Sequence, residues 1–240
     1  MTLGELAFAC YIFDKNNDEY AKFLKAAKRL DLDEDKDCVT LIELLNCHWG
    51  CRRPEVSHKE AGKKLKTWHE KWADKLFNKD KNLCKLKLEE LKSAATIYNE
   101  LLKCKVEYVT RNNKTRSISF GPTTAAKILF FLRPKALPPW DDAIKKELVR
   151  RKSINGHNEK ELYENFLIHV KEVVHALRED CKKNGFELEE LPQKLNKPNY
   201  ITIPKLIDEY YWITITRRIA PPAREVLQCW LKCYNREPSD

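Results

Sequence analysis

Apolar residues recur every three or four positions through most of this chain, which is the spacing that places them on one face of an α-helix. Residues 58–77 show it most clearly, with an apolar stripe formed by Ala61, Leu65, Trp68, Trp72 and Leu76. The same spacing predicts helices at residues 3–13, 20–30, 39–49, 86–104, 141–152, 160–183, 204–214 and 222–234. The pattern therefore predicts an all-α protein.

The helical spacing gives way to another pattern between residues 106 and 119. Val106, Tyr108 and Thr110 alternate with polar positions, which predicts a small hairpin or extended loop. Its tip carries the basic residues Arg111, Lys114 and Arg116. These side chains suit phosphate groups, although exposed loops are also basic simply for solubility.

Three residues near the start of the 58–77 helix carry signals for helix ends. Gly50 follows an apolar helix and is a natural C-cap residue. Ser57 and Glu60 have the spacing of a capping box at the start of the next helix. Together these signals predict that one helix ends at Gly50 and that the next begins after a short turn. The two tryptophans of this helix, Trp68 and Trp72, are more typical of core anchors than of base-stacking residues.

Charge adds a functional hint to this helical pattern. The 240 residues carry a formal net charge of +9 and an isoelectric point near 9.0. Such a balance favours an anionic partner, most commonly nucleic acid, although a protein that is merely basic is also consistent with it. No run approaches the roughly 18 apolar residues of a membrane span. The first thirteen residues lack the basic region of a signal peptide. We expect an intracellular monomer, cytoplasmic or bound to the nucleoid.

The nine cysteines follow no disulfide framework and indicate reduced thiols. A zinc site from Cys47, His48, Cys51 and His58 is a weak alternative, since no second cysteine pair accompanies them. Another pair, Cys229 and Cys233, lies one helical turn apart, which more often indicates a shared buried face. We therefore predict no metal and no cofactor.

Alternating acids at residues 31–37 superficially resemble a calcium loop. Lys36 stands where such a loop needs glycine, and Ile42 stands where it needs the bidentate acid. An acidic turn before a helix N-terminus is the better interpretation.

Residues 117–144 combine features that suit anion binding and chemistry. Phe120, Gly121 and Pro122 form a tight-turn signal, and a short amphipathic helix follows. A proline-rich bend then leads to the paired acids Asp141 and Asp142 at the start of another helix. Amides of such a turn and a helix N-terminus can hold a phosphate.

This segment resembles the core of the helix-hairpin-helix Gly/Pro/Asp superfamily of DNA glycosylases, which includes endonuclease III and 8-oxoguanine-glycosylase-like proteins. The resemblance covers about thirty residues. It is carried by the Thr124–Ala125 pair, by Pro138 and Pro139 in the bend, and by the spacing of seventeen positions from Thr124 to Asp141. It implies a two-lobed helical fold that binds double-stranded DNA containing a lesion or mismatch.

Departures from the family pattern refine what the resemblance implies. Ser119 replaces the first hairpin glycine, and Thr123 stands at the position of the Schiff-base lysine of bifunctional members. The family's iron–sulfur cysteines are also missing. The resemblance therefore implies a monofunctional glycosylase that uses water. Lys127 is a conceivable displaced nucleophile, but one helical turn of displacement favours a phosphate contact or surface residue.

Asp141 is the predicted catalytic residue, because an ionised carboxylate stabilises the positive charge that develops when the N-glycosidic bond breaks, and it can orient water. A helix cap is its alternative role. Asp142 is predicted to be a helix-start charge. Trp140 is a weaker candidate for lining the base pocket, with the core as its alternative. The predicted DNA-binding residues are Ser119, Phe120, Gly121, Thr123, Thr124, Lys127 and Lys145. Further basic residues that suit a phosphate track are Lys146, Arg150, Arg151, Arg217 and Arg218.

The expected lobes are residues 37–137, a helical bundle ending in the hairpin motif, and residues 1–36 with 138–240. The leading function is excision of a damaged or mismatched base from DNA. A non-catalytic DNA-binding module on the same fold and a helical protein-interaction scaffold are the competing hypotheses.

Overall fold

The computed structural model describes residues 1–16, 19–27, 29–51, 54–110 and 112–234. The helices are α1 (Leu3–Asn16), α2 (Glu19–Ala27), α3 (Asp35–Trp49), α4 (His58–Trp72), α5 (Leu88–Lys103), α6 (Pro122–Leu132), α7 (Asp142–Arg150), α8 (Glu159–Lys183), α9 (Leu191–Lys194), α10 (Ile203–Tyr211) and α11 (Arg224–Tyr234). A π-helix, Trp212–Thr216, directly continues α10. The prediction of an all-α protein is confirmed.

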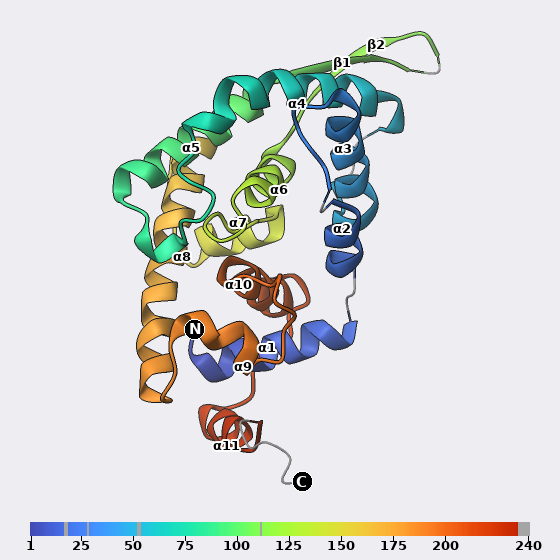
Figure 1. The fold of residues 1–240 in the computed structure, drawn as a ribbon. Helices are drawn as coiled ribbons and strands as arrows, with labels where there is room; N and C mark the ends of the chain where they lie inside the picture. Colours follow the sequence, from blue (N-terminus) through green and yellow to red (C-terminus); the bar gives the residue numbers. More distant parts are fainter. Residues whose placement is uncertain (17–18, 28, 52–53, 111, 235–240) are drawn as a thin grey trace.

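The alternating segment forms the predicted hairpin. Strands β1 (Lys105–Val109) and β2 (Thr115–Ser119) pair antiparallel, with Val106 opposite Ile118 and Tyr108 opposite Arg116. Val106 is buried, whereas β2 is exposed at every position except Ile118. The hairpin therefore projects from the helical body, held mainly through β1 (Figure 1). Of its predicted basic tip, Arg111 lies outside the described residues.

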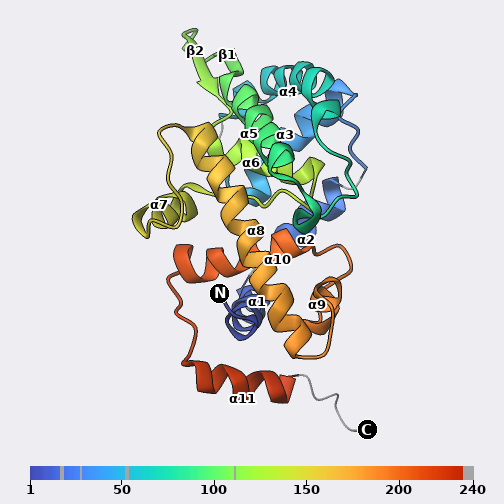
Figure 2. The same cartoon turned by 90° about the vertical axis from the view of Figure 1, so that its left-hand side faces the viewer.

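The helices form two groups joined by one long helix (Figure 1). The α6 group contains α2, α3, α4 and α5 around α6, and the α1 group contains α1, α9, α10 and α11. Helix α8 runs along both, packing on α5 and on α1. Figure 2 shows α7 and the hairpin on the same side of the molecule.

A single cluster of buried apolar side chains continues through both groups, from Leu6 of α1 to Leu45 of α3, Tyr98 of α5 and Ile207 of α10. Helix α2, which the sequence assigned to the second lobe, packs against α3. The proposed lobe boundaries at residues 37 and 137 stay a prediction.

One local expectation, the capping box before α4, is wrong. Ser57 donates its hydroxyl to the carbonyl of Pro54 at 2.6 Å and makes no cap to α4, while Glu60 pairs with Lys63. A short 3-10 turn, Glu55–Ser57, precedes α4, so Ser57 already has helical backbone angles and its side chain is directed back to that turn. Gly50, by contrast, does end α3 in the left-handed conformation, with φ 65°.

Candidate active site around Asp141

Asp141 lies at the N-cap of α7, immediately after the proline-rich bend. Its backbone is extended, and its Oδ1 atom accepts a hydrogen bond of 2.8 Å from the amide of Ile144. Ile144 and Leu148 bury one face of α7 in the core and so fix where the helix begins. The sequence prediction of Asp141 at a helix start is confirmed, and the capping role that was its alternative is real.

The surroundings of Asp141 make its carboxylate harder to ionise. Burial raises the pKa of this side chain, and the amide of Ile144 lowers it again. The negative charge of Asp208 on α10 raises the pKa further, and the ammonium of Lys127 lowers it. The net result is a pKa above the ordinary aspartate value, for a group that is only partly buried. Such a perturbed acid is typical of functional sites, although structural networks perturb acids as well.

Asp208 was not singled out from the sequence, because nothing in the local pattern of α10 distinguishes it from a surface acid. Its carboxylate is held 2.8 Å from the ammonium of Lys205, one turn earlier, and it is 15% exposed. Only the fold brings α10 close to the start of α7.

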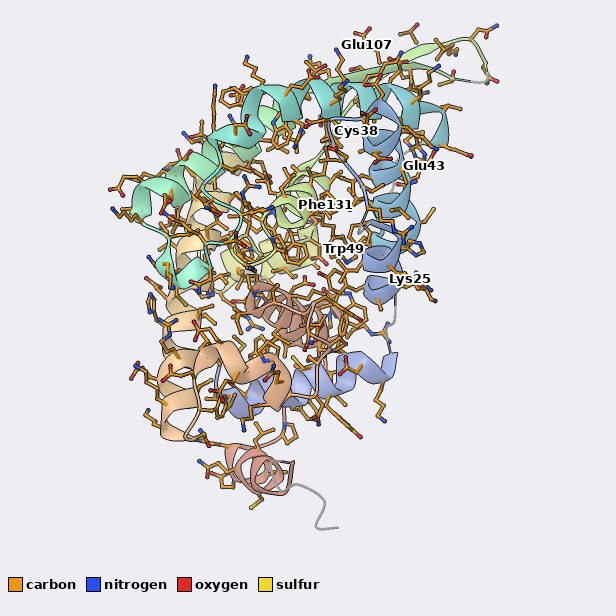
Figure 3. The ribbon with its side chains drawn as sticks, in the orientation of Figure 1. Lys25, Cys38, Glu43, Trp49, Glu107 and Phe131 are labelled. Atoms are coloured by element: carbon orange, nitrogen blue, oxygen red, sulfur yellow. The ribbon has the colours of Figure 1, made fainter. Side chains whose placement is uncertain are left out.

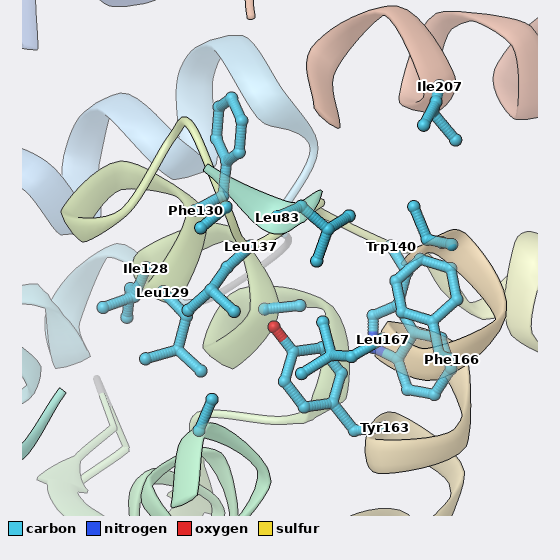
Figure 4. Packing of buried hydrophobic residues seen from close by; sticks show 14 of the residues in the cluster. Leu83, Ile128, Leu129, Phe130, Leu137, Trp140, Tyr163, Phe166, Leu167 and Ile207 are labelled. Carbon is cyan, nitrogen blue, oxygen red and sulfur yellow. The ribbon is translucent and has the colours of Figure 1, made fainter. Parts of the chain in front are cut away.

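Trp140 lies in the core rather than on an open surface. Its ring is 1% exposed, stacks on Phe166 at 4.8 Å between centroids, and meets Tyr163 edge-on at 5.5 Å (Figure 4). The indole nitrogen has no hydrogen-bond partner among the described residues. The core interpretation of Trp140 is thus the one that its packing supports, since the ring offers almost no surface to a base.

The turn before α6 has the predicted sharp geometry but a different neighbour. Gly121 has φ 74°, a conformation that favours glycine, and Pro122 occupies the first turn of α6. Strand β2, not a helix, precedes this turn, so Ser119 is an exposed strand residue. Phe120 and Thr124 are buried, whereas Thr123 is partly exposed. Of these predicted DNA contacts, Ser119, Gly121 and Thr123 retain accessible surface.

Lys127 is directed toward the end of α3. Its ammonium donates to the carbonyl of Trp49, the last residue of α3, and lies 5.3 Å from the centre of the Trp49 ring. Figure 3 shows the Trp49 side chain between α3 and α6. A cation at a helix C-terminus is favourable, so Lys127 has a structural task besides its electrostatic effect on Asp141.

Lys145 is also engaged within the protein. Its ammonium is 2.7 Å from Glu159 and 3.7 Å from Asp142, and its side chain is 14% exposed. Asp142 additionally pairs with Lys146 at 2.5 Å, and these lysines lower its pKa. Asp142 is thus a charged residue in the first turn of α7, as predicted.

A basic groove begins one residue after Asp141. It has a volume of about 580 Å³ and lies between α7 and the segment that follows α10. Its charged lining residues are Asp142, Lys146, Glu147, Arg150, Arg151 and Arg218. We call it the α7 groove. The sequence named its four cations as a possible phosphate track, but it gave no sign that Arg218 joins residues lying almost seventy positions earlier.

Glu147 organises the arginines of the α7 groove. It lies 2.7 Å from both Arg150 and Arg151, and these two guanidinium groups lower its pKa to about 2. Arg218 has a left-handed backbone, with φ 57°, and makes no ion pair with any described residue. With four cations and two acids, the groove has an excess of two positive charges.

No group of three or more His, Cys, Asp or Glu side chains within the described ranges is arranged to hold a metal ion. The residues of the weak zinc alternative have other partners: His48 contacts Glu19 at 2.7 Å, and His58 contacts Asn46 at 3.3 Å. Cys47 is exposed while Cys51 is buried. In the acidic turn, Asp37 accepts the amide of Asp31 at 2.8 Å, as a helix-start turn requires. Cys229 is exposed, and the side chain of Cys233 lies outside the described part of the chain.

Among the described helices, none combines the length and the apolar character that crossing a membrane requires. Three comparisons with known proteins, against family models, curated proteins and solved structures, found no match for this chain. Functional inference therefore rests on the residues around Asp141 and on the motif that carries the glycosylase resemblance.

Proposed function

We propose that this chain is a monofunctional DNA glycosylase that excises a damaged or mismatched base by hydrolysis. The observation that carries the proposal is the position of Asp141: a partly buried acid with a raised pKa, at the end of the Pro-rich bend and directly beside the basic α7 groove. Within the proposal the molecule is a monomer with the two-lobed glycosylase fold, and its partner is double-stranded DNA.

The proposed reaction needs little more than a carboxylate and water. The target nucleotide is first flipped out of the duplex, at a cost of about a few kcal/mol. The C–N bond then breaks, its electron pair leaves with the base, and positive charge develops on the anomeric carbon. Ionised Asp141 stabilises that charge, and water adds to the carbon. The proton of the water passes to the carboxylate and from there to solvent, and the departing base takes up a proton from solvent. No lysine is needed, in line with Thr123 at the Schiff-base position.

The α7 groove supplies the proposed contacts to the DNA backbone. Lys146, Arg150, Arg151 and Arg218 line it, and arginine forks bind phosphate oxygens in pairs. Contacts of this kind fix the register of the protein on the duplex without reading its sequence. Since Asp142 also lines the groove, a phosphate bound there lies close to the residue that follows Asp141.

A non-catalytic DNA-binding module is the second candidate, and two observations favour it. The Oδ1 atom of Asp141 already accepts the amide of Ile144, which is a sufficient structural reason for an aspartate here. Strand β2 in place of the helix before the turn also departs from the family. In this hypothesis the α7 groove binds DNA but no base is released.

The deciding experiment presents the purified protein with duplexes that carry 8-oxoguanine, uracil or an alkylated base, followed by hot alkali to cut at abasic sites. We expect one lesion to be released. Asp141→Asn keeps the cap to Ile144 and removes the charge, so it is expected to lower the excision rate by about 10²-fold or more while duplex binding persists. Asp80→Asn, an exposed aspartate that pairs with Lys135 outside the α7 groove, is the matched control. Release of none of the lesions, or full activity of Asp141→Asn, contradicts the proposal.

A further inference from the structure

A second groove, unrelated to Asp141, is lined by residues of α4, the end of α5 and the start of β1. It has a volume of about 680 Å³. The residues that matter to its chemistry are Lys64, Trp68, Lys71, Trp72, Lys105 and Glu107. We call it the α4–β1 groove.

Basic and aromatic side chains alternate along the face of α4 that forms this groove. Lys64, Trp68 and Lys71 follow one another at helical spacing, so they share one side of the helix. Trp72 continues the row and is partly exposed, whereas Trp68 is 2% exposed. The expectation that both tryptophans are core anchors therefore fits Trp68 better than Trp72.

Three lysines of the groove are available to an anionic ligand. Lys64, Lys71 and Lys105 form no ion pair within the described ranges. The acids Glu60 and Glu100 are already matched, lying 2.8 Å from Lys63 and 2.5 Å from Lys103. Glu107, on the exposed face of β1, is the remaining acid of the lining.

Lys64 and Lys71 also act on a common point. Burial raises the pKa of the Cys104 thiol at the end of α5, and both ammonium groups lower it. Both lysines therefore lie close enough to the end of α5 to act on the thiol, as does Glu100, whose charge raises the pKa.

The tryptophans complete the site. The ring of Trp72 has the ammonium of Lys75 at 4.2 Å and that of Lys71 at 5.2 Å from its centre. The indole nitrogen of buried Trp68 has no hydrogen-bond partner in the described part of the protein. Because this nitrogen is buried, the partly exposed ring of Trp72 is the one that can meet a ligand in the groove.

We propose that the α4–β1 groove binds a short stretch of single-stranded nucleic acid, with a base stacked on Trp72 and the neighbouring phosphates on Lys64, Lys71 and Lys105. Aromatic rings between cations are the arrangement that single strands use, because every base has a face that stacks and every nucleotide has a phosphate. A duplex offers its phosphates but not the faces of its bases. An acidic peptide uses the lysines and has no need of the Trp72 ring.

The test measures binding of a fluorescent oligonucleotide of about twelve deoxythymidines by anisotropy at low salt. Trp72→Ala is expected to weaken binding by about 5-fold or more, and Trp72→Phe to retain most of it. Lys71→Glu, at an exposed position, is expected to weaken binding without any change in the core. Lys194→Glu, an exposed lysine of α9 outside the groove, makes the same charge change and is expected to bind as the parent does.

Heparin serves as a polyanion without bases. If Trp72→Ala binds the oligonucleotide as tightly as the parent does, the proposal is overturned. This holds even if Lys71→Glu weakens binding of both the oligonucleotide and heparin, because that pattern indicates a surface that binds any polyanion. Melting temperatures show whether the variants are folded. If Trp72→Ala is unfolded, Lys71→Glu still tests the proposal. The outcome is independent of base excision, because groove variants are expected to keep the lesion-releasing activity of the parent, and a chain that releases no base can still bind the single strand here.

Discussion

Asp141 gives one carboxylate two tasks that make opposite demands on it. As a helix cap it accepts the Ile144 amide, and as a proposed catalyst it must be charged when the glycosidic bond breaks. Burial and Asp208 oppose that charge, while the Ile144 amide and Lys127 favour it. The balance leaves the pKa raised, so the ionised fraction falls at a higher pH than for an ordinary aspartate.

The pH dependence of excision tests this balance. Excision needs ionised Asp141, so the rate is expected to fall as the pH drops through the raised pKa. Asp208→Asn removes a negative neighbour, which lowers the pKa of Asp141 and moves this acid limb to lower pH. Asp142→Asn, beside the site but paired with Lys146, is expected to leave the limb in place. Single-turnover excision rates measured across the acid pH range locate this limb. If the rates of the parent and of Asp208→Asn fall at the same pH, Asp208 does not influence the pKa of Asp141.

At the scale of the element, one acidic residue of α7, Glu147, binds two of the basic residues of the α7 groove. Glu147 holds Arg150 and Arg151 and is ionised at any working pH, because its pKa is about 2. Its charge therefore competes with a phosphate for both guanidinium groups.

Glu147→Gln is expected to tighten duplex binding by about 2- to 5-fold at low salt, since exposed ion pairs are weak and their removal leaves both guanidinium groups available to phosphate. The gain is expected to shrink as salt rises. Binding isotherms at several salt concentrations measure it, with Glu190→Gln, exposed and remote from the groove, as the control. Unchanged or weaker binding would mean that the α7 groove does not contact the backbone.

Helices α3 and α4 meet at a glycine, and this contact sets the frame around α6. A Cβ atom at Gly62 would lie 2.4 Å from Cγ2 of Val39 and 2.8 Å from its backbone nitrogen. Backbone atoms cannot step aside as a flexible side chain can. Gly62 is thus required by packing and not by its own backbone angles.

Gly62→Ala is therefore expected to destabilise the protein by about 1–3 kcal/mol, the usual cost of overpacking. In an open helix the same change stabilises by up to about 1 kcal/mol. Urea unfolding measures the difference, and Ser93→Ala at an exposed position of α5 shows the ordinary effect of alanine. A stabilised Gly62→Ala protein would show that α3 and α4 lie further apart.

The sequence predicted individual helices and strands better than it predicted which of them pack together. Periodicity located α4 and α5 because a helix buries one stripe wherever its partner lies, and alternation located the hairpin for the same local reason. The helix start at Asp141 was predicted because its bend and its cap are local too. Asp208, Arg218 and the Trp49 carbonyl that holds Lys127 come from distant segments, and no local pattern records which segments the fold brings together.

At the scale of the whole molecule, a buried network of charges joins the two ends of the chain. Lys197 lies 2.6 Å from Asp14 of α1 and 2.7 Å from Glu209 of α10, and Lys205 lies 3.7 Å from the same glutamate. The side chains of Lys197 and Glu209 are each 2% exposed. Removing one member leaves an unmatched charge in a place that water does not reach.

Lys197→Met is expected to destabilise the protein by about 3–5 kcal/mol, because Glu209 then loses its nearer cation. Lys197→Met combined with Glu209→Leu is expected to recover much of that loss, since the buried charge is gone as well. Urea unfolding of parent, single and double variants measures this. If the double variant loses as much stability as the two single variants lose together, the buried charges of Lys197 and Glu209 do not depend on each other.

Packing of α1 against α10 also has a consequence during synthesis on the ribosome. Helix α1 is made well before α10, the helix that packs against it, which begins almost two hundred residues later in the chain. The α6 group can reach its native contacts while translation continues, because its helices follow one another closely in the chain. The nascent chain must therefore carry α1 without this packing partner until α10 has been made, and residues such as Leu6, Ala9 and Phe13, buried in the folded protein, are a natural binding site for chaperones in that interval.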